Sequence, residues 1–351
     1  MDINVLIFLL GGLFLGWSLG ANDAANVFGT AVGSRMVQFK TAAIICSVFV
    51  ILGAVISGAG TTETLGKLGS INALPGAFAA TVSAGLSVYL MSKLGIPVST
   101  TQSIVGAIVG WNIYTGASTN VKILITIVAT WVLCPVISAV LAMGLYKFTK
   151  YYLNRAKLHL LRLDAYTRIV LIIAGAFGAY SLGANNIANV VGVFVPVSPF
   201  SDISFNSFSL GSNKQLFLIG GIAIAVGVFT YSKKVMFTVG YEMMKLNPSA
   251  ASIIVISHSI ILFLFASQGI SSFLSSVNLP SIPLVPVSSS QAIVGAVLGI
   301  GLLKGGQELK WDIIRKISFG WVLSPIIAVF FSITILFILE NIFGQSVSSN
   351  Y

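Results

Sequence analysis

Two short stretches of the chain carry asparagine inside long apolar runs, and the first also carries an aspartate. Residues 18–26 read SLGANDAAN, and residues 181–189 read SLGANNIAN. Their carboxamide and carboxylate oxygens are hard ligands, which suit Na⁺ better than a soft transition metal. A helix that faces lipid would not carry such groups, since a charged side chain inside the membrane costs about 3 kcal/mol or more. The two stretches therefore predict a cation site within a membrane.

Each stretch contains a glycine, Gly20 or Gly183, at which we expect the helix to break and to free backbone carbonyls for the same cation. The first and last asparagines of each copy lie four residues apart, so they share one helix face. Asparagine can also serve only to join helices, at about 1 kcal/mol per contact. The duplication favours the cation site, whose predicted ligands are Asn22, Asp23, Asn26, Asn185, Asn186 and Asn189.

A second pair of stretches carries hydroxyl groups and glutamine. Residues 96–107 read IPVSTTQSIVGA, and residues 285–296 read VPVSSSQAIVGA. In each, a proline favours an extended backbone and a Ser/Thr cluster then opens a short apolar helix. A helix N-terminus offers free N–H groups and the positive end of the helix dipole, which together attract an anion. Ordinary capping is the alternative, but one cap needs only one hydroxyl.

We expect the two helix starts to surround one oxyanion. The predicted anion ligands are Thr101, Gln102, Ser103, Ser290 and Gln291. The remaining hydroxyls join the predicted cation ligands: Ser99, Thr100, Ser288 and Ser289. Because no Lys or Arg falls in the inferred core, bound cations would supply the positive charge beside the anion. Each ion would then stabilise the other, which predicts symport.

The composition indicates a polytopic membrane protein with an all-α fold. Of 351 residues, 56% are hydrophobic and only 8% are charged, whereas a soluble domain has about 25% charged residues. Several apolar runs approach the length that crosses a bilayer, but those at 101–116 and 290–303 are short, as in re-entrant or discontinuous helices. Cys46 and Cys134 lie inside apolar runs and are interpreted as small buried hydrophobes.

Three blocks recur in the same order and indicate an internal duplication. They are the two pairs above and a third pair, WVLCP at 131–135 and WVLSP at 321–325. We predict a first repeat over 1–147, a basic cytoplasmic linker over 148–165 and a second repeat over 166–351. Each half makes an odd number of crossings when 73–116 and 249–303 form re-entrant, hairpin-like segments. The fold class is therefore two inverted-topology repeats with broken helices, and a substrate site is expected near the midplane where they meet.

The basic residues predict the orientation of the chain. With the linker inside, fifteen Lys and Arg residues face inward and three face outward, as the positive-inside rule expects. Both termini are then extracellular. The outward set is Lys67, Lys122 and Lys214. The inward set is Arg35, Lys40, Lys147, Lys150, Arg155, Lys157, Arg162, Arg168, Lys233, Lys234, Lys245, Lys304, Lys310, Arg315 and Lys316.

Other functional classes fit the sequence less well. A channel needs a continuous polar path, whereas the polar residues here cluster at mid-chain positions. A membrane enzyme needs a nucleophile with a base or a metal set, and the two histidines, His159 and His258, lie near no motif. His258 is open to two interpretations, a satisfied core histidine or a proton relay, and the first is favoured. The net charge of +10 belongs to the loops, so no nucleic-acid partner is expected.

The GANDAAN string at 20–26 resembles the repeated signature of the inorganic phosphate transporter (PiT) family. The Pro-Val-Ser blocks are similar to that family as well, and the resemblance covers nearly the whole chain. It implies secondary import of inorganic phosphate driven by Na⁺ or H⁺, inverted repeats and homodimers. One departure is Asn186, where the family usually has aspartate, which puts a symmetric pair of carboxylate-bound cations in doubt.

The resulting hypothesis is a sodium-coupled phosphate symporter in the plasma or inner membrane. One repeat would rock against the other to alternate access to the site. Sodium is favoured over protons because the predicted ligands are mostly neutral oxygens and Asp23 alone among them titrates. Proton coupling and a sulfate substrate stay open as alternatives. Sulfate is also a tetrahedral oxyanion, but only phosphate can donate a proton to an acceptor such as Asp23.

Overall fold

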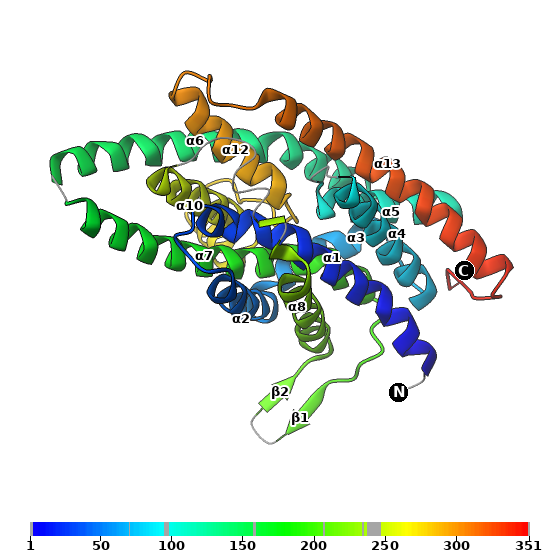
Figure 1. Ribbon diagram of the computed structural model, residues 1–351. Coiled ribbons are helices and arrows are strands. Elements are labelled where there is room, and N and C mark those ends of the chain that lie inside the picture. The colour runs from blue at the N-terminus through cyan, green and yellow to red at the C-terminus, as the bar shows by residue number, and fades with distance from the viewer. Residues whose placement is uncertain are drawn as a thin grey trace.

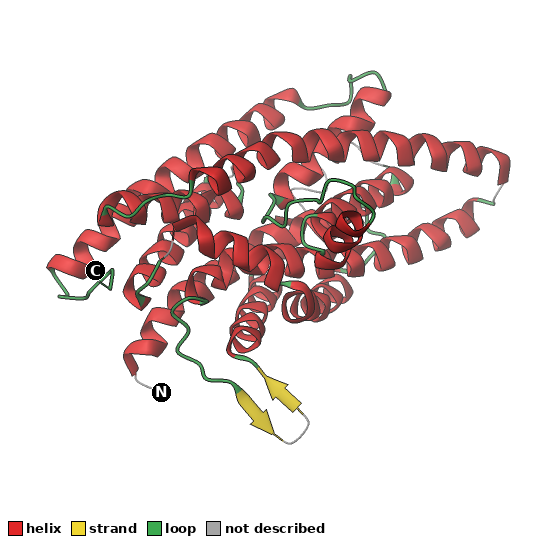
Figure 2. Ribbon diagram, turned by 180° about the vertical axis from the view of Figure 1, so that it is seen from behind, coloured by secondary structure: helices red, strands yellow, loops and turns green. Residues whose placement is uncertain are grey.

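The computed structural model describes residues 3–69, 71–94, 98–156, 159–205, 208–233, 235–236 and 247–349. These residues are almost entirely helical, with one short β-hairpin (Figure 1, Figure 2). Five positions used in the sequence analysis lie outside them: Ile96, Pro97, Lys157, Lys234 and Lys245.

The first half of the chain forms α1 (Ile3–Gly33), α2 (Phe39–Ser57), α3 (Ala59–Gly69), α4 (Leu74–Lys93), α5 (Thr100–Thr115) and α6 (Val121–Ala156). The second half forms α7 (Leu160–Val191), η1 (Gly192–Phe194), β1 (Ile203–Phe205), β2 (Phe208–Leu210), α8 (Ser212–Thr230), α10 (Pro248–Leu264), α11 (Gln268–Ser276), α12 (Ser289–Leu303) and α13 (Trp311–Asn341). Strands β1 and β2 pair antiparallel, with Ile203 opposite Leu210.

The predicted membrane fold is confirmed. Among the described residues, seven helices are long and apolar enough to cross a membrane, or eight if α10 and α11, bent by 67° at their junction, form one span. Helices α5 and α12 are short, as predicted, and begin at the residues that the Pro-Val-Ser blocks indicate. The breaks fall between α4 and α5 and between α10, α11 and α12.

The two halves are interleaved, and four glycines mark the seams. Helix α1 packs on α8, where a Cβ on Gly20 would lie 1.9 Å from the carbonyl oxygen of Ile224. The equivalent seam joins α7 to α2, where a Cβ on Gly183 would lie 2.1 Å from the carbonyl oxygen of Val50. Gly227 and Gly53 repeat this approach from the opposite helix of each pair.

The short helices are exchanged in the same way. A Cβ on Gly106 of α5 would lie 2.3 Å from the carbonyl oxygen of Pro325 in α13. A Cβ on Gly295 of α12 would lie 2.2 Å from that of Pro135 in α6. Each short helix therefore packs on the proline-containing helix of the other half. The same contacts occur twice with the partners exchanged, as two related repeats require.

The expected helix breaks at Gly20 and Gly183 are wrong. Helix α1 continues from Ile3 to Gly33, and α7 continues from Leu160 to Val191. These glycines permit the close approach of a neighbouring backbone, because they have no side chain to hold the two helices apart. Backbone carbonyls at these positions are accordingly part of a continuous helix and are not freed to bind a cation.

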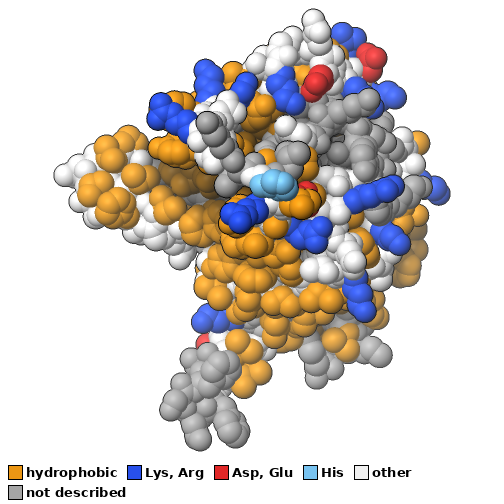
Figure 3. Space-filling view, turned by 60° about the vertical axis from the view of Figure 1, so that its left-hand side comes forward, with side chains coloured by type: hydrophobic (Ala, Val, Ile, Leu, Met, Phe, Trp, Pro, Cys, Tyr) orange, Lys and Arg blue, Asp and Glu red, His pale blue; other side chains and the backbone are white. Residues whose placement is uncertain are grey.

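The ends of the molecule agree with an odd number of crossings in each half. The start of α1 and the end of α13 lie at one end, and the connection between α6 and α7 lies at the other (Figure 1, Figure 2). Lys and Arg side chains gather over the end that carries this connection (Figure 3). Helix α6 continues to Ala156 and α7 starts at Leu160, so most of the predicted linker, 148–165, consists of the facing helix ends. The repeat boundaries stay a prediction.

Candidate functional site

Helices α5 and α12 begin next to each other in the interior. The hydroxyl of Thr101 in α5 donates to the carbonyl of Val287, which precedes α12, over 3.2 Å. Each helix is capped by a serine: Ser99 accepts a hydrogen bond from the backbone N–H of Gln102 over 3.3 Å, and Ser288 accepts one from that of Gln291 over 3.2 Å. One hydroxyl caps each helix, so the other polar groups of the blocks are left for other contacts.

All of the predicted site residues are buried, and none is more than 7% exposed. Asp23 is the single acidic residue among the buried side chains of the described residues. No Lys or Arg side chain of that part of the chain is buried. Within the described residues, the interior therefore has one potential negative charge and no buried Lys or Arg to offset it.

The first asparagine of each motif holds the segment ahead of a short helix in its own half. The amide of Asn22 donates to the carbonyl of Val98 over 3.3 Å. Asn185 accepts from the N–H of Val287 over 2.8 Å and donates to the carbonyl of Val285 over 3.3 Å. These carboxamides fix the extended segments that deliver Ser99 and Ser288 to the helix starts. Asn185 uses both sides of its carboxamide in this way.

The last asparagine of each motif reaches into the other half. The amide of Asn26 donates to Ser289 Oγ over 3.1 Å, and that of Asn189 donates to Thr101 Oγ1 over 2.9 Å. The two motifs and the two helix starts thus form one cluster that is built from both repeats. A rearrangement of one repeat against the other would have to change these two bonds.

The middle residue of the motif differs between the copies. Asp23 Oδ2 accepts a hydrogen bond from Thr100 Oγ1 over 2.8 Å, and Oδ1 accepts one from Asn22 over 3.4 Å. At the matching position, Asn186 Oδ1 accepts from Asn189 over 3.3 Å, while its buried Nδ2 has no hydrogen-bond partner among the described residues. The first copy offers a carboxylate and the second offers an N–H donor.

Several other buried polar atoms of the cluster have no partner within the described part of the chain. They are Gln102 Oε1, Gln291 Oε1 and Asn189 Oδ1. Buried polar atoms usually have a partner, so atoms of this kind are candidates for ligand contacts. Ser290 is more engaged, since it lies 3.0 Å from Ser288 Oγ and accepts from Trp321 Nε1 over 3.2 Å. Ser103 donates to the carbonyl of Ser99 over 3.2 Å in its own helix turn, and no hydrogen bond joins its hydroxyl to the described residues of the other half.

Two residues outside the predicted site also contact this cluster. His258 of α10 is fully buried, and its Nε2 lies 2.9 Å from Ser289 Oγ. Trp321 of α13 contacts Ser290. The sequence could have indicated Trp321, because this residue is the first of the third repeated block. Nothing in the sequence indicates the contact of His258, which depends on how α10 packs on α12.

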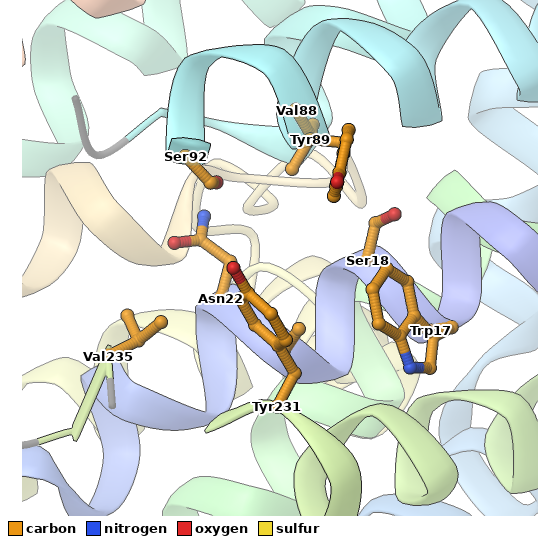
Figure 4. A pocket seen from close by; sticks show the side chains of 9 residues that line it. Trp17, Ser18, Asn22, Val88, Tyr89, Ser92, Tyr231 and Val235 are labelled. Atoms are coloured by element: carbon orange, nitrogen blue, oxygen red, sulfur yellow. The ribbon is translucent and has the colours of Figure 1, made fainter. Parts of the chain in front are cut away.

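A small, mostly apolar pocket lies beside the first motif (Figure 4). Its lining comes from α1, α4 and the residues that follow α8: Trp17, Ser18, Ala21, Asn22, Val88, Tyr89, Ser92, Tyr231 and Val235. Trp17 Nε1 donates to Thr230 Oγ1 over 2.9 Å and so fixes α1 against α8 at the wall of the pocket. Asn22 lines this pocket and also bonds to Asp23, so the pocket reaches the edge of the cluster.

Comparisons with known proteins give consistent results. The model of the phosphate transporter family, PHO4, matches residues 19–166, 157–278 and 281–350. A candidate phosphate permease of Methanocaldococcus jannaschii is 28% identical over 329 residues, which cover 93% of this chain and 95% of that protein. The sulfate permease CysP of Bacillus subtilis is 28% identical over 357 residues, which cover 98% of this chain and 88% of that protein.

One solved structure shares the fold. The sodium-dependent phosphate transporter matches with a TM-score of 0.76 at 23% identity, over 97% of this chain and 100% of that chain. The likeness extends from α1 to α13, so it includes both repeats and both short helices. It confirms the fold class that the duplicated blocks predict.

Proposed function

This chain belongs to the phosphate transporter family, and from that premise we propose that it imports inorganic phosphate together with sodium. Family membership makes it a transporter and not an enzyme, and it confirms the resemblance carried by the repeated motifs. The observation that supports the site most directly is the pair of bonds from Asn26 to Ser289 and from Asn189 to Thr101. They join the motif of each repeat to the helix start of the other.

Phosphate would bind between the starts of α5 and α12. The donors are the positive ends of two helix dipoles with the hydroxyl and amide groups of the blocks. The proposed anion ligands are Thr101, Gln102, Ser103, Ser290 and Gln291. Ser103 has the weakest support, because its hydroxyl is already bonded within its own helix turn.

Sodium would bind next to the anion and supply the positive charge that the buried side chains lack. Asp23 with Thr100 is the centre of this proposal, since a carboxylate and a neighbouring hydroxyl oxygen are ligands that Na⁺ prefers. The other proposed cation ligands are Asn22, Asn26, Ser99, Asn185, Asn186, Asn189, Ser288 and Ser289. The name of the structural match, a sodium-dependent transporter, supports sodium as the coupling ion.

Transport would proceed by alternating access between the interleaved repeats. The pocket beside Asn22 would then be part of an access route. In the sequence, Lys233 lies between two residues that line it, Tyr231 and Val235, and Lys233 belongs to the basic set predicted to face the cytoplasm. This orientation gives extracellular termini in a cell membrane. Apolar side chains of α6 and α13, such as Val132, Val136 and Phe330, are exposed and would face lipid or a second copy in a homodimer.

Labelled phosphate uptake into proteoliposomes tests the function. An inward Na⁺ gradient at fixed pH should drive uptake, and an inward proton gradient without Na⁺ should not. Uptake under the proton gradient alone would contradict sodium coupling. The B. subtilis relative makes sulfate the second candidate substrate, so excess unlabelled sulfate is the competitor. Sulfate uptake without phosphate uptake would replace the substrate assignment and leave the site intact.

A further inference from the structure

We propose that the two halves of the site have opposite polarity. The hydroxyl oxygen of Thr100 is directed at the cation, whereas the hydroxyl hydrogen of Ser289, held in place by His258 and Asn26, is directed at the anion. This inference rests on the proposed function and deepens it. It moves Ser289 from the predicted cation ligands to the anion ligands, and it makes His258 a positioning residue.

Thr100 and Ser289 occupy equivalent places. They align in the repeated blocks, and each is the first residue of its short helix, α5 or α12. Both side chains are buried. Any difference in what their hydroxyl groups offer must therefore come from their neighbours.

The neighbour of Thr100 accepts a hydrogen bond. Thr100 Oγ1 lies 2.8 Å from Asp23 Oδ2, and an ionised carboxylate can only accept, so Thr100 donates its hydrogen to Asp23. The lone pairs of Thr100 Oγ1 have no donor among the described hydrogen bonds. A hydroxyl whose hydrogen is used by a carboxylate presents oxygen to its surroundings, as a cation ligand should.

The neighbours of Ser289 donate hydrogen bonds. The amide of Asn26 donates to Ser289 Oγ over 3.1 Å. His258 Nε2 lies 2.9 Å from the same atom, and His258 Nδ1 has no partner within the described residues. A neutral imidazole has a single N–H, and an unpaired buried N–H is rarer than an unpaired acceptor. The proton therefore belongs on Nε2, where it is donated to Ser289.

Ser289 then accepts two hydrogen bonds, and its own hydrogen has no partner in the cluster. A hydroxyl in this state presents hydrogen to a ligand, and the ligand that fits is an oxyanion. The second motif also offers a donor, because the buried Nδ2 of Asn186 is an N–H group at the position equivalent to the carboxylate of Asp23. The carboxylate-bound cation thus belongs to the first motif, and the second motif contributes donors without charge.

Separate binding titrations on the purified protein test this assignment. Sodium binding is measured without phosphate, and phosphate binding is measured at saturating sodium. Ser289→Ala should weaken phosphate binding by about tenfold or more, the loss expected for a hydrogen bond to a charged group. His258→Leu should weaken it about fivefold, the loss expected for a neutral hydrogen bond of about 1 kcal/mol. Both variants should change sodium affinity less than twofold. Thr100→Val should weaken sodium binding by about tenfold in the absence of phosphate.

Two further variants separate positioning from folding. His258→Gln keeps an N–H donor near the place of Nε2 and should retain most of the phosphate affinity that His258→Leu loses. Ser332→Ala removes a buried hydroxyl that bonds to the carbonyl of Ala107 outside the cluster, and it should change neither affinity. Thermal unfolding of every variant identifies any that fold poorly.

Three outcomes would overturn the assignment. The first is a loss of sodium affinity in Ser289→Ala with phosphate binding unchanged, and the second is an equal loss of both. The third is a His258→Gln variant as impaired as His258→Leu when both are folded. If the unmodified protein binds sodium but not phosphate, the proposed substrate fails, and the same titrations with sulfate then decide the polarity.

Discussion

The two repeats meet through matched backbone contacts, but only the first places an acidic side chain in the described interior. Their backbones meet at matched glycines, Gly106 against Pro325 and Gly295 against Pro135, at nearly equal separations. The side chains that reach the interior differ, because Asp23 is paired with Thr100 while the amide nitrogen of Asn186 has no partner among the described residues. Close backbone contacts tolerate no added atom, whereas the polar positions beside them can change without altering the packing. The packing between the repeats can thus stay symmetric while only the first repeat supplies a carboxylate for a cation.

The largest effect should come from removing the carboxylate that distinguishes the first motif. Asp23→Asn makes the two motifs alike at this position and leaves the described core without a buried acid. Sodium-driven phosphate uptake should fall at least a hundredfold, because the cation loses its charged ligand. Uptake into proteoliposomes is the measurement, and size-exclusion chromatography checks folding. Uptake at the normal rate would mean that the carboxylate is structural and that the halves do not differ in function.

The shared scaffold can be tested at its tightest contacts. A Cβ on Gly295 would lie 2.2 Å from the carbonyl oxygen of Pro135, so Gly295→Ala should destabilise the protein by about 1–3 kcal/mol, as overpacking does. Gly106→Ala should have a similar effect, because its contact with Pro325 is the same. The control is Gly144→Ala, since a Cβ there has no neighbour within 4 Å. Thermal unfolding compares the three, and stable seam variants would show that the repeats are not locked together there.

The comparison of the halves also shows what the sequence could predict. The doubled blocks locate both helix starts, both serine caps and the set of buried polar residues, because each of these is a local property of a short string. The seam glycines could not be interpreted correctly in the same way. A glycine within an apolar run is compatible with a helix break and with a close helix contact, and the choice depends on a helix distant in sequence, α8 for Gly20 and α2 for Gly183.

The different hydrogen-bond partners of the asparagines could also not be predicted from the sequence. Asn22 and Asn26 lie four residues apart on one helix face, yet Asn22 bonds within its own half and Asn26 bonds to the other. His258 bonds to Ser289, 31 residues away. These pairings follow from how helices distant in sequence pack on one another, within a half as well as between the halves, and no local pattern contains that information.

Restoring the acid in the second motif should reduce the asymmetry. Asn186→Asp places a second carboxylate among buried groups and a second potential cation ligand at the equivalent position. Phosphate uptake should then depend more steeply on sodium concentration, and phosphate affinity at low sodium should fall several-fold because the added charge repels the anion. Uptake measured over a range of sodium concentrations tests this. An unchanged sodium dependence would indicate that the second motif cannot form a cation site even with a carboxylate.

The smallest effect concerns the paired tryptophans of the third block. Trp321 Nε1 donates to Ser290 over 3.2 Å, whereas the buried Nε1 of Trp131 has no partner among the described residues. Trp321→Phe should therefore weaken phosphate binding about fivefold, the effect of a lost hydrogen bond worth about 1 kcal/mol, because Ser290 is no longer fixed. Trp131→Phe removes no such bond and should leave phosphate affinity within twofold. Equal effects in the two variants would mean that the tryptophans act through packing alone, and the anion donors of the second half would then be Ser289 and Asn186.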